Sequence, residues 1–90
     1  MTEESRPPLR EASRILDTRG TYCPQPVIET DAAMRSLAPG EVLEILADDV
    51  GVRYDLPAWC SAHKQRLLGI ESEAGLLRVQ IMKVAPPDPS

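Results

Sequence analysis

A cysteine followed by two closely spaced prolines is the feature that most restricts how this chain can fold. Pro24 directly follows Cys23, and Pro26 comes two residues later, at the start of a stretch with helical hydrophobic spacing. Proline has its φ angle fixed near a helical value and lacks an N–H donor, so it suits the first turn of a helix. The sequence therefore predicts a helix that begins at Pro24, with Cys23 as its N-cap residue.

This position has a chemical consequence for the thiol of Cys23. The sulfur would lie near the unpaired N–H groups of the first turn and the positive end of the helix dipole, and both favour the reactive thiolate. Gly20 allows a sharp turn before the cysteine, and Arg19 and Arg14 would add positive charge if they approach the sulfur. Spacing alone leaves a second interpretation open, because many free cysteines are small, buried apolar residues.

Hydrophobic periodicity and turn residues predict six elements in the order β-α-β-α-β-β. The expected strands are residues 14–17, 41–47, 67–72 and 76–84, and the expected helices are residues 24–38 and 51–65. The strand at 41–47 is apolar on most of both faces, which is typical of a strand inside a sheet. In the second helix, Pro57 predicts an irregularity.

Two helices can cover only one face of a four-stranded sheet, which predicts an α+β fold. We expect a two-layer α/β sandwich with a mixed sheet and both helices on one face. The first β-α-β unit should be parallel and right-handed, and the last two strands should form an antiparallel hairpin. The domain is expected at residues 13–84, between flexible tails at residues 1–12 and 85–90.

Composition excludes several classes of function. The formal net charge is −4, and no basic stripe with interleaved aromatic residues is present, so direct binding of nucleic acid is not expected. No cofactor motif appears. No signal peptide or long apolar segment is visible either, which favours a cytoplasmic protein that does not enter a membrane and keeps its thiols free.

The remaining candidate ligands are few. One histidine and two cysteines are too scattered for a zinc site, and the adjacent acids Asp48 and Asp49 are interpreted as turn-forming and capping residues. Cys60 shares an apolar helix face with Trp59 and is interpreted as buried and structural, while His63 is expected to be neither ligand nor base. A disulfide between the two cysteines remains possible on spacing alone.

Several short motifs occur in a specific order along the chain. They are Leu16-Asp17, Gly20-x-x-Cys23-Pro24-x-Pro26, Pro39-Gly40-Glu41, Asp48-Asp49, Asp55-Leu56-Pro57-x-Trp59-Cys60 and Leu67-Leu68. In this respect the chain resembles the TusA/SirA/YedF family of small sulfur-carrier proteins over roughly residues 15 to 84. The resemblance implies the same fold and a catalytic cysteine that carries sulfane sulfur as a persulfide, and only Cys23 matches that position. Gly20, Pro24, Pro26 and Arg19 would then shape the site around it.

The expected function is therefore a sulfurtransferase-type carrier that acts with partner enzymes. Cys23 would accept sulfur from a donor such as a cysteine desulfurase or a rhodanese-type protein and pass it to an acceptor sulfurtransferase. Members of the resembling family serve tRNA thiolation, molybdenum-cofactor assembly and sulfur oxidation. Two alternatives remain: a thiol-based redox sensor or regulatory protein-binding module, and a purely structural role for the Cys-Pro-x-Pro segment.

Overall fold

The computed structural model describes residues 11–85. Most of the two predicted tails, residues 1–12 and 85–90, lies outside this range. The six elements follow in the predicted order: β1 (Arg14–Asp17), α1 (Gln25–Arg35), β2 (Val42–Ala47), α2 (Val52–His63), β3 (Arg66–Glu73) and β4 (Leu76–Met82). Neither helix within residues 11–85 has the length and apolar character that a bilayer-spanning helix requires.

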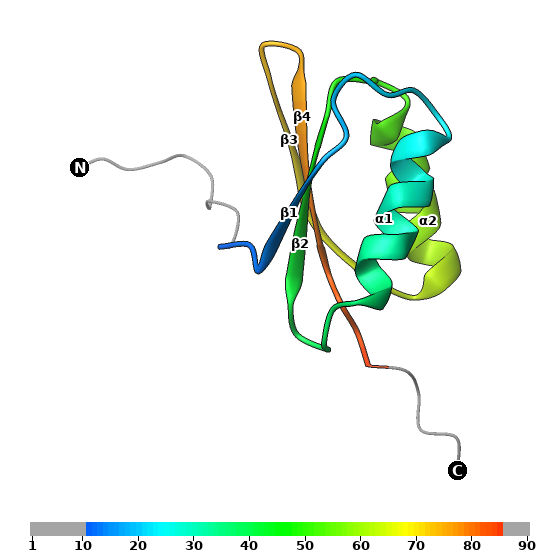
Figure 1. The fold of residues 1–90 in the computed structure, drawn as a ribbon, viewed down its shortest axis with the longest axis vertical. Coiled ribbons are helices and arrows are strands. Elements are labelled where there is room, and N and C mark those ends of the chain that lie inside the picture. The colour runs from blue at the N-terminus through cyan, green and yellow to red at the C-terminus, as the bar shows by residue number, and fades with distance from the viewer. Residues whose placement is uncertain (1–10, 86–90) are drawn as a thin grey trace, which may run out of the picture.

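The four strands form one mixed sheet in the order β1-β2-β4-β3. β1 runs parallel to β2, whereas β4 is antiparallel to both of its neighbours. α1 and α2 lie side by side against the same face of the sheet (Figure 1). The predicted α+β two-layer architecture is confirmed, and so is the interior position of β2.

The hydrophobic core lies between the sheet and the two helices. Leu43 and Ile45 of β2 lie opposite Ile81 and Val79 of β4 in the strand register, and all four are fully buried. They share one face because successive side chains of a strand point to opposite sides. Leu56 of α2 is also fully buried in this cluster. Burying each such side chain stabilises the fold by about 1.5–3 kcal/mol.

α1 begins one residue later than predicted, and this changes the setting of the thiol. Its N-cap residue is Pro24, with φ −96° and ψ 12°, and not Cys23. The prediction was wrong because proline fixes φ alone, and the ψ of Pro24 lies outside the helical range. The Cys23–Pro24 peptide bond is cis. Pro26 is the second helical residue, where its missing N–H would have had no partner within the helix.

The other end of α1 comes three residues before the predicted end. The hydroxyl and the N–H of Ser36 both donate to the carbonyl of Ala33, at 2.8 and 3.1 Å. These bonds tighten the last turn, so the chain leaves the helix after Arg35. Leu37 still packs against the core from outside the helix.

α2 runs from Val52 to His63 without interruption, although Pro57 lies in its second turn. The predicted irregularity is therefore not a break in the helix. Proline removes the hydrogen bond that would otherwise reach the carbonyl of Arg53, but the chain continues in helical conformation. Lys64, with φ 57°, ends the helix in the left-handed conformation, and its N–H donates to the carbonyl of Cys60.

The β3–β4 hairpin closes through a two-residue turn. Ala74 and Gly75 have φ values of 52° and 85°, and two positive φ angles match the twist of a tight hairpin. β3 extends one residue beyond its predicted range at each end. β4 ends at Met82, before the predicted Val84.

Candidate functional site

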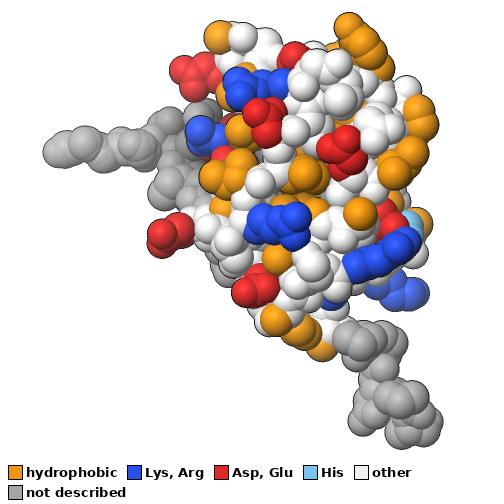
Figure 2. All heavy atoms as spheres, viewed as in Figure 1, with side chains coloured by type: hydrophobic (Ala, Val, Ile, Leu, Met, Phe, Trp, Pro, Cys, Tyr) orange, Lys and Arg blue, Asp and Glu red, His pale blue; other side chains and the backbone are white. Residues whose placement is uncertain are grey.

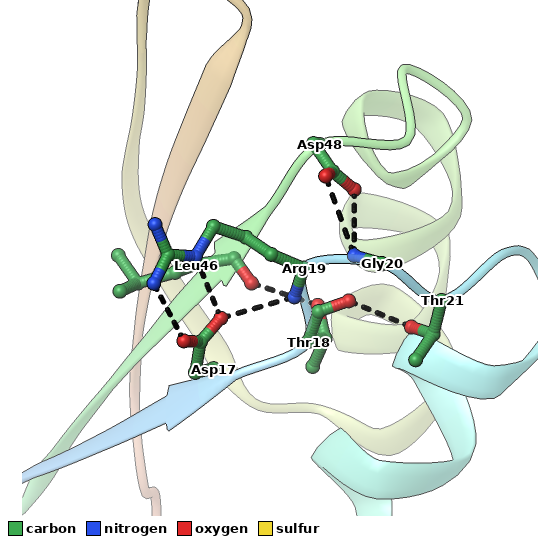
Figure 3. A network of polar contacts seen from close by, with 7 residues as sticks. All are labelled: Asp17, Thr18, Arg19, Gly20, Thr21, Leu46 and Asp48. Carbon is green, nitrogen blue, oxygen red and sulfur yellow. Dashed lines mark hydrogen bonds and ion pairs between the residues drawn. The ribbon is translucent and has the colours of Figure 1, made fainter.

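Residues 18–24, here called the thiol loop, connect β1 to α1 and carry Cys23. The N–H and the hydroxyl of Thr18 both donate to the carbonyl of Leu46, at 2.8 Å each, and this fixes the start of the loop to β2. The hydroxyl of Thr21 donates to the carbonyl of Thr18 at 2.7 Å (Figure 3). The loop therefore leaves the sheet in a defined direction.

A second anchor holds the middle of the thiol loop. The N–H of Gly20 donates to both carboxylate oxygens of Asp48, at 3.1 and 3.3 Å (Figure 3). Gly20 has φ 88°, a conformation that favours glycine because it has no Cβ. Asp48 follows β2, so the contact joins the loops after two parallel strands. Parallel strands end at the same edge of a sheet, which explains why these loops meet.

The two arginines that would add positive charge if they approached the sulfur are hydrogen-bonded to other groups. The Nε and one terminal nitrogen of Arg19 donate to the carboxylate of Asp17, at 2.9 and 2.8 Å. These bonds, with the backbone N–H of Arg19, lower the pKa of Asp17 to about 2. Arg14 donates to the hydroxyl of Ser36 at 2.6 Å. The expected positive charge beside the sulfur is therefore not found, although Arg19 still orders the start of the loop.

Carboxylates surround Cys23 instead. Its sulfur lies 2.8 Å from Oδ2 of Asp55 and donates a hydrogen bond to it. Its backbone N–H donates to Oδ2 of Asp49, also at 2.8 Å. The other oxygen of Asp49 accepts the N–H of Gly51 at 3.1 Å, and these backbone bonds lower the pKa of Asp49. Cys23 is exposed, so a reactant can reach the sulfur from solvent.

This environment reverses the predicted ionisation of the thiol. The hydrogen bond to Asp55 raises the pKa of Cys23, and partial desolvation and the negative charges of Asp55 and Asp49 raise it further. The prediction of a favoured thiolate was wrong for two reasons. The helix begins beyond the cysteine, and the neighbouring groups are anions that disfavour a second negative charge.

Neither of these two acids was identified from the sequence as part of the thiol site. Asp49 was interpreted as a turn residue and Asp55 as part of a motif, and they lie 26 and 32 positions from Cys23. The parallel pairing expected for β1 and β2 could have located them, since it brings the thiol loop and the start of α2 to one edge of the sheet. The thiol loop holds Gly20, Cys23 and Pro24 together, while Pro26 is buried in the first turn of α1.

The second cysteine has the opposite environment. Cys60 is only 3% exposed and packs in the core, and burial raises its pKa to about 11. Both cysteines are free thiols. Beside Cys60, Trp59 is also buried and stacks on His63 with ring centroids 4.5 Å apart. The interpretation of Cys60 as a buried residue is confirmed.

No group of three or more His, Cys, Asp or Glu side chains in residues 11–85 is arranged to hold a metal ion. The acids beside Cys23 are instead used as hydrogen-bond acceptors. What the arrangement offers chemically is an accessible thiol with a carboxylate placed to accept its proton.

Comparison with known proteins identifies the family. The sequence model described as "Sulfurtransferase TusA" matches residues 14–83. The putative sulfur carrier protein YrkI of Bacillus subtilis is 36% identical over 73 residues, which cover 81% of this chain and 97% of the relative. The sulfur carrier protein TusA of Pseudomonas entomophila is 40% identical over 70 residues, which cover 78% of this chain and 88% of the relative.

A further sequence relative is longer, and a solved structure with the same fold is also similar. The putative sulfur carrier protein YrkF of Bacillus subtilis is 41% identical over 70 residues, 78% of this chain, but the match spans only 38% of its own length. The structure of a SirA-like protein from Desulfitobacterium hafniense matches with a TM-score of 0.70 at 26% identity, covering 80% of this chain and 99% of that one. By sequence and by fold, this chain belongs to the TusA family of small sulfur-carrier proteins.

Proposed function

We propose that this protein accepts sulfane sulfur on Cys23 as a persulfide and relays it to an acceptor protein. The observation that carries the proposal is the exposed Cys23 sulfur, 2.8 Å from the Asp55 carboxylate at the edge of the sheet. Relatives named sulfur carriers support the role at the level of the family. Cys60 cannot take this part, because it is buried in the core.

The transfer begins with Cys23 as a thiol, because its acidic neighbours oppose ionisation. As the Cys23 sulfur attacks the outer sulfur of a donor persulfide, its proton passes to Asp55. A new S–S bond forms on Cys23 while the S–S bond of the donor breaks, and the donor sulfur leaves as a thiolate. That thiolate takes up a proton, so the step moves one sulfur atom without net oxidation or reduction. Such exchange depends on the ionisation of the attacking thiol and on its accessibility.

The relay requires partners on both sides of this step. We propose a cysteine desulfurase or a rhodanese-type protein as the donor and a sulfurtransferase as the acceptor, in a pathway such as tRNA thiolation. Cys23 must stay reduced between transfers, which favours a reducing compartment such as the cytoplasm.

The redox-sensor alternative has less support. Oxidation of a thiol by peroxide depends on its thiolate character, and Asp55 and Asp49 reduce that character in Cys23. A carrier tolerates this environment, because a docked partner holds its persulfide against the sulfur while the carboxylate removes the proton. A purely structural role for the Cys-Pro-x-Pro segment also has less support, because Cys23 is exposed and accessible to a reactant.

The test is intact-protein mass spectrometry after incubation with a persulfide-bearing donor. We expect a mass increase of one sulfur atom in the wild type and in Cys60→Ala, reversed by dithiothreitol, and none in Cys23→Ala. Circular dichroism checks that each variant is folded. Sulfur uptake by folded Cys23→Ala, or its loss in Cys60→Ala alone, would contradict the assignment.

A further inference from the structure

Three exposed apolar side chains lie next to the groups that surround the thiol. Tyr22, Val50 and Tyr54, here called the apolar collar, are 76%, 67% and 72% exposed. Each is the immediate neighbour of a site residue: Tyr22 precedes Cys23, Val50 follows Asp49, and Tyr54 precedes Asp55. Hydrogen bonds join these three segments at the cysteine, so the collar belongs to one end of the molecule.

The collar is unusual for a chain with so few aromatic residues. The sequence holds two tyrosines, one tryptophan and no phenylalanine, and both tyrosines are exposed and directly precede a residue of the thiol site. Figure 2 shows hydrophobic side chains at the upper right of the molecule, the end at which Figure 1 places the thiol loop. Exposed tyrosines are enriched at protein-docking surfaces, and here both belong to the segments that meet at the cysteine.

The charge inside the collar is negative. Asp49 and Asp55 face the thiol, and neither forms an ion pair with a lysine, arginine or histidine among residues 11–85. Their contacts are with uncharged groups, namely backbone N–H groups and the Cys23 thiol. No described basic side chain therefore pairs with either carboxylate near the sulfur.

We propose that the partner surface that docks on Cys23 presents lysine or arginine side chains around its own reactive sulfur, with apolar side chains that contact the collar. This inference rests on the proposed sulfur-carrier function and specifies its partner class. A basic surface is attracted to Asp49 and Asp55 during approach, and the collar excludes water once the two sulfurs meet. An acidic protein, a nucleic acid or an anionic lipid surface would be repelled by the same carboxylates.

Two matched peptides test the charge requirement, and neither depends on the identity of the natural partner. One is a persulfidated Lys-Leu-Cys-Lys peptide, and the other is persulfidated Glu-Leu-Cys-Glu, both with blocked ends. At low ionic strength we expect Cys23 to take up sulfur at least about tenfold faster from the lysine peptide. The preference should shrink as salt is raised, because about 0.1 M salt screens charges beyond about 10 Å.

Variants locate the source of the preference. Asp49→Asn keeps an oxygen that can accept the Cys23 N–H but removes a charge, so the preference for the lysine peptide should fall several-fold. Glu41→Gln is the matched control, since Glu41 lies at the opposite end of the sheet and its carboxylate accepts the N–H of Ala38, a bond that the glutamine amide oxygen can keep. It should keep the full preference. Tyr54→Ser should slow uptake from both peptides, because both carry the leucine that contacts the collar.

The outcomes separate this inference from the proposed function. Equal rates with the two peptides, or faster uptake from the glutamate peptide, would overturn the basic-partner inference while leaving persulfide carriage intact. An equal loss of preference in Glu41→Gln and Asp49→Asn would also overturn it, since the effect would then be one of net charge. Failure of Cys23 to take up sulfur from either peptide and from a cysteine desulfurase would overturn the proposed function itself.

Discussion

The buried thiol of Cys60 should make the stability of this protein fall at high pH. Burial raises the pKa of Cys60 from 9.0 to about 11 in the folded protein, whereas in the unfolded chain the thiol regains the ordinary value. A raised folded pKa contributes stability that is fully present below the unfolded pKa and is lost as pH rises through the folded value. The relevant window therefore runs from pH 9.0 to about pH 11.

The expected size follows from the two pKa values. One pKa unit corresponds to about 1.4 kcal/mol, so the two-unit difference costs about 2.8 kcal/mol of unfolding free energy once the thiol is ionised in both states. About 2 kcal/mol of this is lost between about pH 8 and about pH 11, where the folded thiol is only half ionised. That loss is a large part of the roughly 5–15 kcal/mol that stabilises a typical domain. The thiolate fraction of folded Cys60 should also be roughly a hundredfold lower than that of an unperturbed thiol near pH 8.

Urea unfolding of the wild type and of Cys60→Ala, at both pH values, measures this effect. Every other titrating group, Cys23 included, is present in both proteins and cancels in the difference between them. We expect the wild type to lose about 2 kcal/mol more than Cys60→Ala on going to the higher pH. Equal losses in the two proteins would refute the reasoning, and so would rapid alkylation of Cys60 in folded Cys23→Ala at about pH 8.

Two further predictions concern the thiol loop. Gly20→Ala should destabilise the protein by about 1–2 kcal/mol, because alanine is strained at φ 88° although no atom lies within 4 Å of the new Cβ. Gly20→Asn should lose less stability, because asparagine tolerates a positive φ better. Thermal melts that rank the two variants the other way would contradict this. Asp55→Asn removes the main cause of the raised Cys23 pKa, so the midpoint of the pH profile for alkylation of Cys23 by iodoacetamide should fall below that of the wild type. An unchanged or higher midpoint would show that Asp55 does not oppose ionisation.

The fold was predictable because its main signals are local. Leu43, Ile45, Val79 and Ile81 alternate with residues of the opposite sheet face, so the two central strands and their core faces follow from a period of two. The order of elements then limits the architecture to helices on one face. The element ends were less predictable, and Ser36 is an example. Its bonds to the preceding turn, which end α1, have no periodic pattern in the sequence.

The chemistry of the site was less predictable because it depends on contacts between distant segments. Cys23 was identified from its motif, but its ionisation is set by Asp55 and Asp49, which are remote in sequence. A single angle also mattered. The ψ of Pro24 moves the helix start beyond the cysteine, so the pKa shift expected from the helix dipole had the wrong sign.

The acids that oppose ionisation of Cys23 also build the loop that presents it. Asp49 holds the Cys23 N–H and Asp48 holds the N–H of Gly20, so the side chains that fix the shape of the loop also supply its negative surroundings. A thiol in this setting reacts slowly with stray electrophiles and oxidants, because little thiolate is present. In the transfer that we propose, a docked partner holds its persulfide against the sulfur while Asp55 removes the proton, so the step needs no free thiolate. The arrangement therefore suits a carrier whose selectivity comes from docking, with the exposed tyrosines and the carboxylates of Asp49 and Asp55 as the surface that the correct partner must match.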